Sequence, residues 1–202
     1  MLVREVMTTP VVTVPPAASI RQAVRLLYEQ NITAAPVVDD EGRLAGIVSE
    51  MDLLRREFEA DPRAFARPAA TPDEPPPHRV AEVMTRETRT VRETTDVAEL
   101  ADLMITTGLK SVPVLRGDTL VGIVSRRDLM GVLAHSDARI RDDVLAAIEE
   151  LLPGATTWSV SVQDGTVRLR GRADPRTQEI VDVLARTVPG VSRVDIVGTT
   201  TD

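Results

Sequence analysis

The chain has 202 residues, no cysteine and a formal net charge of −7 at neutral pH. The lack of cysteine excludes a disulfide framework and thiolate metal sites, and an aromatic content of only 2% predicts cores of aliphatic side chains. The acidic balance disfavours general binding to nucleic-acid phosphates, so no nucleic-acid partner is expected. The first residues leave no room for a signal-peptide apolar region, and no stretch is long enough to span a membrane, so a cytoplasmic location is expected.

An internal repeat organises the first two-thirds of the chain. The first copy, residues 1–57, opens on Val-Arg-Glu-Val-Met-Thr and closes near Gly-Ile-Val-Ser-Glu-Met-Asp-Leu. The second copy, residues 80–134, opens on Val-Ala-Glu-Val-Met-Thr and closes near Gly-Ile-Val-Ser-Arg-Arg-Asp-Leu. A repeat that occurs only twice is not a solenoid. We expect the two copies to pair about a pseudo-two-fold axis, with two related clefts where they meet.

Each copy carries the same signals for secondary structure. Ser19 is the expected cap of a helix in the first copy, and Asp96 is the expected cap in the second, with Glu99 in a capping-box position. After each helix comes a short strand that contains a proline, a Gly- and Asp-rich turn, a second strand and a second helix. Each copy therefore predicts a β-α-β-β-α unit with a mixed sheet covered by helices. The paired strands are expected at 36–38 and 44–48, and at 113–115 and 120–124.

The segment between the copies differs in composition. Residues 58–79 contain six prolines, including the run Pro75-Pro76-Pro77. This composition forms no core and favours extended chain, so we expect a connecting linker.

The last part of the chain, residues 137–202, predicts a small α-β-β-α-β domain. Asp137 is the expected cap of its first helix, and Trp158 opens a strand of alternating apolar and polar residues. Asp164-Gly165 is a strong hairpin signal. Asp174-Pro175 has the form of a helix cap followed by proline at the first helical position. The fold class of the whole chain is therefore expected to be α/β (α+β).

The two Gly-Ile-Val-Ser motifs are the candidate ligand sites. Ser49 and Ser125 each end a strand and can cap the next helix, whose first N–H groups suit a phosphate. Asp52 and Asp128, three residues on, can accept hydrogen bonds from a ribose diol. The same spacing also makes an ordinary capping pair, but its occurrence twice in a matched repeat favours a ligand site.

The two copies resemble a tandem pair of cystathionine-β-synthase (CBS) domains. The resemblance rests on Val-Met-Thr at 6–8 and 83–85, on the strands with Pro36 and Pro113, and on the two Ser-x-x-Asp motifs. It implies that each Asp holds a ribose, that each Ser helps to hold a phosphate, and that the ligand is AMP, ADP, ATP or S-adenosylmethionine. The adenine side is implied to be Thr33, Ala34 and Ala35 in the first copy, and Lys110, Ser111 and Val112 in the second.

The two motifs carry different charges. The second has Arg126 and Arg127 between Ser and Asp, with Lys110 in its adenine-side loop, whereas the first has Glu50 and Met51. Extra cations favour a phosphate, so we expect Asp128 to matter more than Asp52 for nucleotide binding. The apolar residues of the helix after each motif exceed what a small sheet must cover, which predicts a homodimer through the repeat pair. These residues are Met51, Leu54, Met130 and Leu133.

The C-terminal part resembles a BON domain. The residues that carry the resemblance are the helix from Asp137, the hairpin at 164–171 and the segment 188–194. The resemblance implies an association with phospholipid. Arg168, Arg170 and Arg172 lie on one face of a strand and could meet anionic head groups, but nearby acidic residues favour an ordinary solvated face.

The predicted function is that of a cytoplasmic regulatory protein. The repeat pair senses an adenosine nucleotide, and the BON domain relays the bound state to an unidentified protein partner or a phospholipid surface. No catalytic constellation appears, the two histidines have no metal-ligand spacing, and no required cofactor is expected, so the chain is not expected to be an enzyme. The alternatives are a ligand-free dimerisation scaffold and a membrane-surface adaptor that acts through the BON domain.

Overall fold

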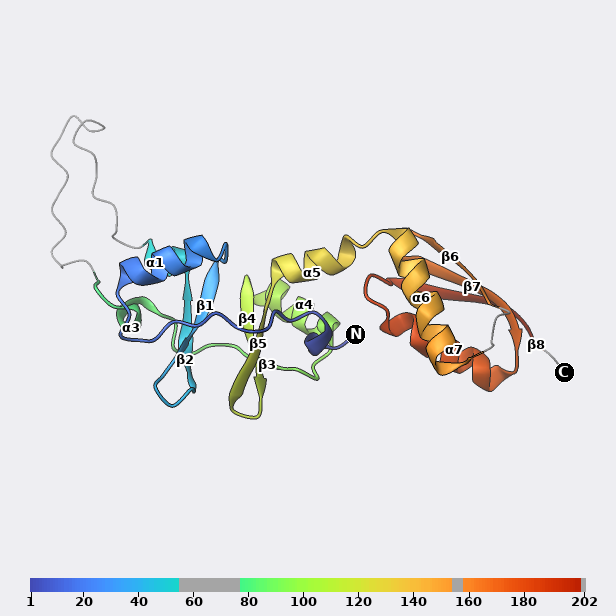
Figure 1. Ribbon diagram of the computed structural model, residues 1–202, viewed down its shortest axis with the longest axis horizontal. Coiled ribbons are helices and arrows are strands. Elements are labelled where there is room, and N and C mark those ends of the chain that lie inside the picture. The colour runs from blue at the N-terminus through green and yellow to red at the C-terminus, as the bar shows by residue number, and fades with distance from the viewer. Residues whose placement is uncertain (55–76, 154–157, 201–202) are drawn as a thin grey trace, which may run out of the picture. The chain divides into compact units, whose positions relative to one another are not determined.

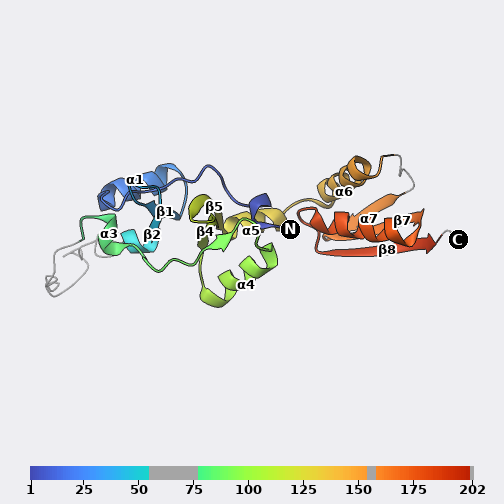
Figure 2. The same cartoon turned by 90° about the horizontal axis from the view of Figure 1, so that it is seen from below.

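The computed structural model describes residues 1–54, 77–153 and 158–200, with side chains described up to residue 197. The chain divides into two compact units (Figures 1 and 2). One contains Met1–Val6, Thr95–Gly108 and Ser125–Asp202, and the other contains Met7–Thr94 and Leu109–Val124. Most of the predicted linker, residues 58–76, lies outside the described residues. The expectation that it is extended therefore concerns residues outside the described part of the chain.

The first repeat contains the predicted helix and strand pair. Helix α1 (Ile20–Glu29) begins at Ser19, whose Oγ accepts a hydrogen bond from the Gln22 amide at 3.2 Å, while Gln22 Oε1 accepts one from the Ser19 amide at 2.9 Å. Strands β1 (Ala34–Val38) and β2 (Leu44–Ser49) form an antiparallel hairpin, and the short helix α2 (Glu50–Leu53) follows β2 directly. The Ser19 cap and the strand–helix junction are thus as predicted.

The core of the first repeat is aliphatic, as the composition predicts. Val14 forms a parallel bridge with Val37 and supplies the first β segment of the β-α-β-β-α order. Val24, on the same helix as the buried Ile20 and Ala23, is 39% exposed. The buried residues are Val14, Ile20, Ala23, Leu27, Ala35, Val37, Val48, Leu53, Val80 and Met84.

The second repeat adds a three-stranded sheet. Its strands are β3 (Val91–Arg92), β4 (Ser111–Arg116) and β5 (Thr119–Ser125), in the order β3-β4-β5, and β3 runs parallel to β4. Helix α4 (Val97–Thr107) precedes β4 in the chain, and helix α5 (Arg126–Leu133) follows β5. The element order predicted for each repeat is therefore confirmed, and the chain is of the α+β class.

The cap of α4 differs from the prediction in one detail. Asp96 caps the helix as predicted, but it accepts a hydrogen bond from the Ala98 amide at 2.7 Å and does not form the predicted capping box with Glu99. Each repeat also opens with a short helical turn that the sequence analysis did not predict: the 3₁₀ helix η1 (Val3–Glu5) in the first and α3 (Val80–Val83) in the second.

Each repeat sends its Met-Thr segment across the Gly-Ile-Val-Ser strand of the other. The backbone of Thr8 pairs with Ile123 in β5, and the backbone of Thr85 pairs with Ile47 in β2. The crossing is so close that a Cβ at Gly46 would lie 2.6 Å from the Thr85 carbonyl oxygen. These two motifs recur in both copies because each is the packing partner of the other.

The C-terminal domain has the predicted order. It consists of α6 (Asp137–Leu151), β6 (Ser159–Gln163), β7 (Thr166–Ala173), α7 (Pro175–Thr187) and β8 (Arg193–Thr200). In the sheet, β6 and β7 are antiparallel, and β7 and β8 are parallel. One face of the sheet contributes to the core together with both helices; its buried residues include Ile140, Val144, Trp158, Val167, Leu169 and Val181.

The prediction that Asp137 caps α6 is wrong. Ser136 is the cap, and its Oγ accepts a hydrogen bond from the Arg139 amide at 3.3 Å. The Asp137 carboxylate instead accepts hydrogen bonds from the amides of Asp164 and Gly165 at 2.9 and 3.0 Å. These two residues have positive φ values of 49° and 71°, as the predicted hairpin turn requires. Asp137 therefore ties the start of the domain to this turn.

Candidate functional site

Both Ser-x-x-Asp motifs adopt the same geometry. In the first, Asp52 Oδ2 accepts hydrogen bonds from the amide and the hydroxyl of Ser49 at 2.9 and 2.7 Å, and Ser49 Oγ accepts one from the Asp52 amide at 3.4 Å. In the second, the corresponding bonds between Ser125 and Asp128 measure 2.7, 2.7 and 3.3 Å. Each pair is thus a reciprocal cap that fixes the carboxylate at the start of a helix.

The reciprocal cap leaves room for a ligand role. In the first motif all the hydrogen bonds of the Asp52 carboxylate given above use one oxygen, Oδ2. The other oxygen, Oδ1, can accept from a donor outside the cap, such as a hydroxyl of a ribose diol. Capping and ligand binding are therefore compatible in the same residue, rather than exclusive alternatives.

The first motif is built from both repeats. Its strand β2 pairs with the second repeat's Thr85 at Ile47, two residues before Ser49. Lys110, also from the second repeat, places its Nζ 3.2 Å from Glu50 Oε1, on the residue that follows Ser49. The sequence analysis grouped Lys110 with the second motif, but the ammonium lies beside the first.

The predicted adenine-side residues of the first repeat adjoin its motif. The Thr33 carbonyl oxygen accepts a hydrogen bond from the Glu50 amide at 2.9 Å, and Ala34 lies opposite Ser49 in the β1–β2 register. Thr33 is exposed, whereas the Ala35 side chain is fully buried in the core. The structure therefore brings Thr33 and Ala34 to Ser49, while the Ala35 side chain contributes to packing.

The second motif is distinguished by its arginines. Arg126 donates hydrogen bonds from Nη2 to the carbonyl oxygens of Gly108 and Met104, at 2.5 and 3.5 Å, and so holds the C-terminal end of α4. A cation at this end of a helix is favourable. Arg127 is exposed. Of the predicted adenine-side residues, Ser111 is 9% exposed and Val112 is fully buried.

The Met-Thr segments lie beside the strands that lead to the two Ser-x-x-Asp motifs, and the sequence did not predict this. Thr85 flanks the strand that leads to Ser49, and Thr8 pairs with Ile123, two residues before Ser125. The signal was present, because Met-Thr recurs in both copies, but nothing in one sequence says which strand such a segment crosses.

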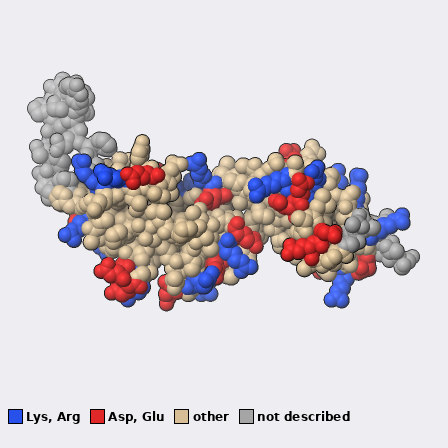
Figure 3. All heavy atoms as spheres, in the orientation of Figure 1, with Lys and Arg blue, Asp and Glu red and all other residues tan. Residues whose placement is uncertain are grey.

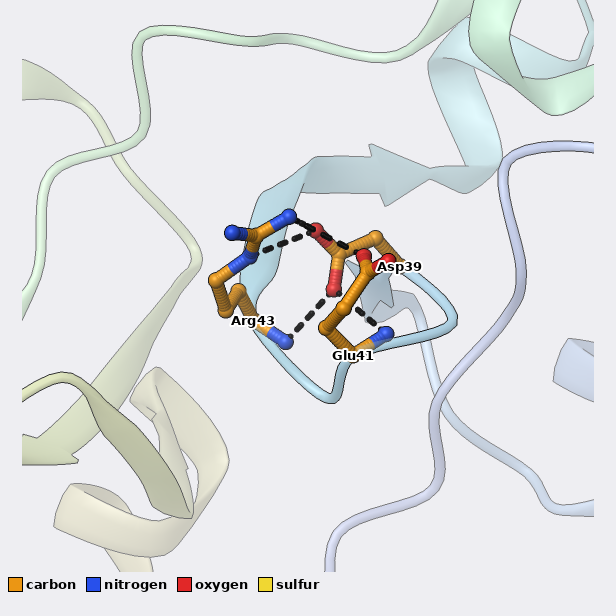
Figure 4. Close-up of polar contacts among 3 residues, drawn as sticks. All are labelled: Asp39, Glu41 and Arg43. Atoms are coloured by element: carbon orange, nitrogen blue, oxygen red, sulfur yellow. Dashed lines mark hydrogen bonds and ion pairs between the residues drawn. The ribbon is translucent and has the colours of Figure 1, made fainter.

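The far end of the β1–β2 hairpin is a rigid polar turn (Figure 4). Asp39 Oδ1 accepts hydrogen bonds from the amides of Arg43 and Glu41 at 2.8 and 3.1 Å, and Arg43 Nε donates to Oδ2 at 2.9 Å. The bond from the Arg43 amide, followed by its guanidinium, lowers the pKa of Asp39 below the usual value. These bonds stabilise the turn, which lies at the opposite end of the β1–β2 hairpin from Ser49.

A surface cavity of about 560 Å³ lies near the hairpin ends of the two repeats. Its lining is mostly apolar, and its one charged residue, Arg116, makes a bidentate ion pair with Glu93 at 2.7 Å. Neither Ser49 nor Asp52 lines it. The lining residues are Met7, Thr9, Pro10, Val11, Thr13, Val38, Gly42, Arg116, Leu120 and Val121.

The three arginines of β7 lie on the face of the C-terminal sheet opposite its core. Arg168, Arg170 and Arg172 are exposed and alternate with the buried Val167 and Leu169. Acidic and basic side chains are interspersed over the face of the molecule shown in Figure 3. Among the described residues, no helix is long and apolar enough to cross a bilayer.

Family models match most of the chain. The CBS domain model matches residues 3–59 and 80–135, and the BON domain model matches residues 136–197. The two CBS matches together span more than half of the chain. They coincide with the two copies of the repeat.

Related sequences cover about two-thirds of the chain. The chain is 30% identical over 132 residues to an uncharacterized 17.7 kDa protein of Acidianus ambivalens. The alignment covers 65% of this chain and 72% of the relative. It is 32% identical over 127 residues to the CBS domain-containing protein YhcV of Bacillus subtilis, with 63% and 81% covered. It also matches 14% of an A-adding tRNA nucleotidyltransferase of Aquifex aeolicus, at 30% identity and over 63% of this chain. Of some larger relatives, therefore, the chain spans only a small part.

Solved structures of CBS domain pairs are also similar to about two-thirds of the chain. The pair of protein MJ0100, in complex with 5′-methylthioadenosine and S-adenosyl-L-methionine, aligns with a TM-score of 0.54 at 27% identity, over 65% of this chain and 94% of that one. CBSX2 in complex with AMP aligns with a TM-score of 0.52 at 28% identity, over 64% and 93%. Since the family model, the doubled motif and the fold all agree, the chain belongs to the CBS domain family, as a tandem CBS pair followed by a BON domain.

Proposed function

We propose that the CBS pair of this protein binds an adenosine nucleotide as a regulatory ligand. The observation that carries the proposal is the duplicated Ser-x-x-Asp pair, whose hydrogen-bond geometry is nearly the same in both copies. In each copy the Asp carboxylate accepts the ribose hydroxyls and the Ser end of the strand faces the 5′ group of the ligand. The ligands AMP, 5′-methylthioadenosine and S-adenosylmethionine in two related CBS pairs support this class of ligand.

A thermal-shift screen with AMP, ADP, ATP and 5′-methylthioadenosine tests the proposal. A ligand that binds only the folded state adds about 2.7 kcal/mol of stability at a hundred times its dissociation constant. For a protein of this size each kcal/mol raises Tm by roughly 2–4 °C, so we expect a rise of roughly 5–11 °C. Inorganic phosphate is the matched control, because it lacks the ribose and the base. No shift with any adenosine ligand would favour the alternative of a ligand-free scaffold.

We further propose that the protein is a homodimer through its CBS pair. Apolar side chains are exposed on the helices of both repeats, among them Tyr28 at 86%, Met51 at 63%, Met130 at 65% and Leu133 at 70%. Burial of such side chains against a second copy would remove apolar surface from water, at about 25 cal/mol per Å². A two-fold dimer uses the same surface on both partners, so the exposed apolar helices of one copy would pack against the same helices of the other copy.

The BON domain is proposed to relay the ligand state of the CBS pair to a partner. A membrane surface is the second candidate, because Arg168, Arg170 and Arg172 share one exposed face of the sheet. Each cation near an anionic lipid surface contributes about 1 kcal/mol. Sedimentation with vesicles that contain phosphatidylserine separates the candidates. A protein partner predicts no co-sedimentation, whereas a membrane adaptor predicts binding that Arg170→Ser weakens.

The catalytic sites of some larger relatives are not proposed for this chain. Names such as A-adding tRNA nucleotidyltransferase belong to proteins of which the chain spans only a small part, 14% and 15% of their length. We propose a regulatory role without catalysis, in the cytoplasm. Recombinant protein should accordingly leave AMP, ADP and ATP chemically unchanged on incubation, which chromatography of the nucleotides can check.

A further inference from the structure

An ion pair between the two repeats lies beside the first Ser-x-x-Asp motif. Lys110 Nζ is 3.2 Å from Glu50 Oε1, and the two side chains are 60% and 43% exposed. Glu50 directly follows Ser49, and its amide is held by the Thr33 carbonyl oxygen at 2.9 Å. Lys110 is the one lysine of the whole chain. The first motif therefore has two carboxylates and one cation close to its serine, since the Asp52 carboxylate also accepts a hydrogen bond from the Ser49 hydroxyl.

This ion pair affects the charge at the place where a 5′-phosphate would lie. A phosphate at Ser49 would bring its negative charge close to the Glu50 carboxylate, and like charges a few ångströms apart repel. The Lys110 ammonium offsets this repulsion only in part, because it is a single cation beside the two carboxylates of Glu50 and Asp52. An exposed ion pair is itself weak, so the effect comes from the balance of charge rather than from the strength of the pair.

The second motif has the opposite balance. Arg126 occupies the position that Glu50 occupies in the first copy, and Arg127 follows it. Arg126 keeps its positive charge while it donates to the Gly108 carbonyl oxygen. With Asp128 included, the side chains of this motif sum to one positive charge, whereas Glu50, Asp52 and Lys110 sum to one negative charge at the first motif. The two motifs therefore differ by two charges.

We propose that the two motifs select different adenosine ligands by the charge of the 5′ group. The first motif takes an adenosine whose 5′ group is uncharged, such as a thioether, and the second accepts a 5′-phosphate. Glu50 is the residue that determines the selectivity, and Lys110 moderates it. This inference rests on the proposed function, because it assigns ligand classes to the same two sites.

Calorimetric titrations of the full chain with AMP and with 5′-methylthioadenosine test the inference. We expect one molecule of AMP per chain and two of 5′-methylthioadenosine. Glu50→Gln keeps the shape and removes the charge, so AMP should then occupy the first motif about five- to tenfold more tightly, while 5′-methylthioadenosine binds as before. Asp40→Asn is the matched control: it removes the same charge from the turn of the same hairpin and should leave both titrations unchanged.

The Asp128→Ala variant isolates the first motif. In it, binding of 5′-methylthioadenosine should persist while AMP binds weakly, and Glu50→Gln added to it should restore AMP binding. Equal affinity of both ligands for Asp128→Ala, or two AMP molecules per wild-type chain at equal affinity, would overturn the inference alone. No heat from either ligand with the wild-type protein would overturn the proposed function and, with it, this inference.

Discussion

Gly46→Ala tests the crossing that joins the two repeats. A methyl group at Gly46 would lie 2.6 Å from the Thr85 carbonyl oxygen and 3.3 Å from Met84 Sδ. The oxygen cannot simply rotate away, because it accepts a hydrogen bond from the Ile47 amide at 3.0 Å, and the Thr85 amide donates back to the Ile47 carbonyl at 2.9 Å. Relief of the clash therefore requires both backbone hydrogen bonds to lengthen.

The expected loss lies at the upper end of the cost of overpacking, about 2–3 kcal/mol. For a protein of this size, this lowers Tm by roughly 4–12 °C, measured by circular dichroism or differential scanning calorimetry. Gly122→Ala should cost less, because the contact there is the flexible side chain of Met7. Gly131→Ala is the control: no atom lies within 4 Å of a Cβ at this helical position, so the variant should gain about 0.5–1 kcal/mol. A Gly46→Ala protein as stable as the wild type would refute the close crossing.

Three further outcomes follow from the structure. Asp137→Ala leaves the Asp164 and Gly165 amides without their carboxylate and should destabilise the BON domain by about 1–3 kcal/mol, measured by denaturant unfolding of the full chain. The hydrogen bond from the Thr177 hydroxyl lowers the pKa of Asp174 in the folded state. The ionised Asp174 therefore stabilises the fold above its unfolded pKa of about 4, and this stabilisation is lost as the pH falls through the folded pKa. Asp174→Ala should accordingly flatten the acid side of a stability–pH curve. Met130→Glu places a charge on a proposed dimer surface and should shift the sedimenting mass toward the monomer; an unchanged mass would place the interface elsewhere.

The order of secondary structure could be predicted because its signals are local. Ser19 and Asp174 occupy cap positions that short-range spacing defines, and both caps form in the structure. The Asp164-Gly165 turn likewise needs two adjacent residues with positive φ, which this dipeptide allows. Such features depend on neighbours in the chain, so a single sequence suffices to place them.

Features that depend on distant neighbours were predicted less well. Asp137 stands next to Ser136, and both residue types are good caps, so the spacing could not show that Asp137 reaches a turn 27 residues away. Lys110 was assigned to the motif of its own repeat, whereas it pairs with Glu50, 60 residues earlier. In both cases the partner is set by how the elements pack, and neither periodicity nor capping rules encode that packing.

The role of the Ser-x-x-Asp motif could be predicted only in part from the sequence. The spacing was compatible with a helix cap and with a ligand site, and the structure contains the cap in both copies. The cap of the first motif uses Oδ2 of its carboxylate and leaves a ligand role open for Oδ1.

Titration of the full chain with AMP by isothermal calorimetry tests the central claim most directly. We expect saturable heat for the wild type, a large loss of affinity in Asp128→Ala and little loss in Asp52→Ala. Circular dichroism of each variant should show the wild-type helix and strand content, so that lost heat reports the site rather than the fold. If the wild type gives saturable heat and the double variant Asp52→Ala, Asp128→Ala binds AMP equally well, the ligand is held elsewhere and the two Ser-x-x-Asp motifs are caps alone.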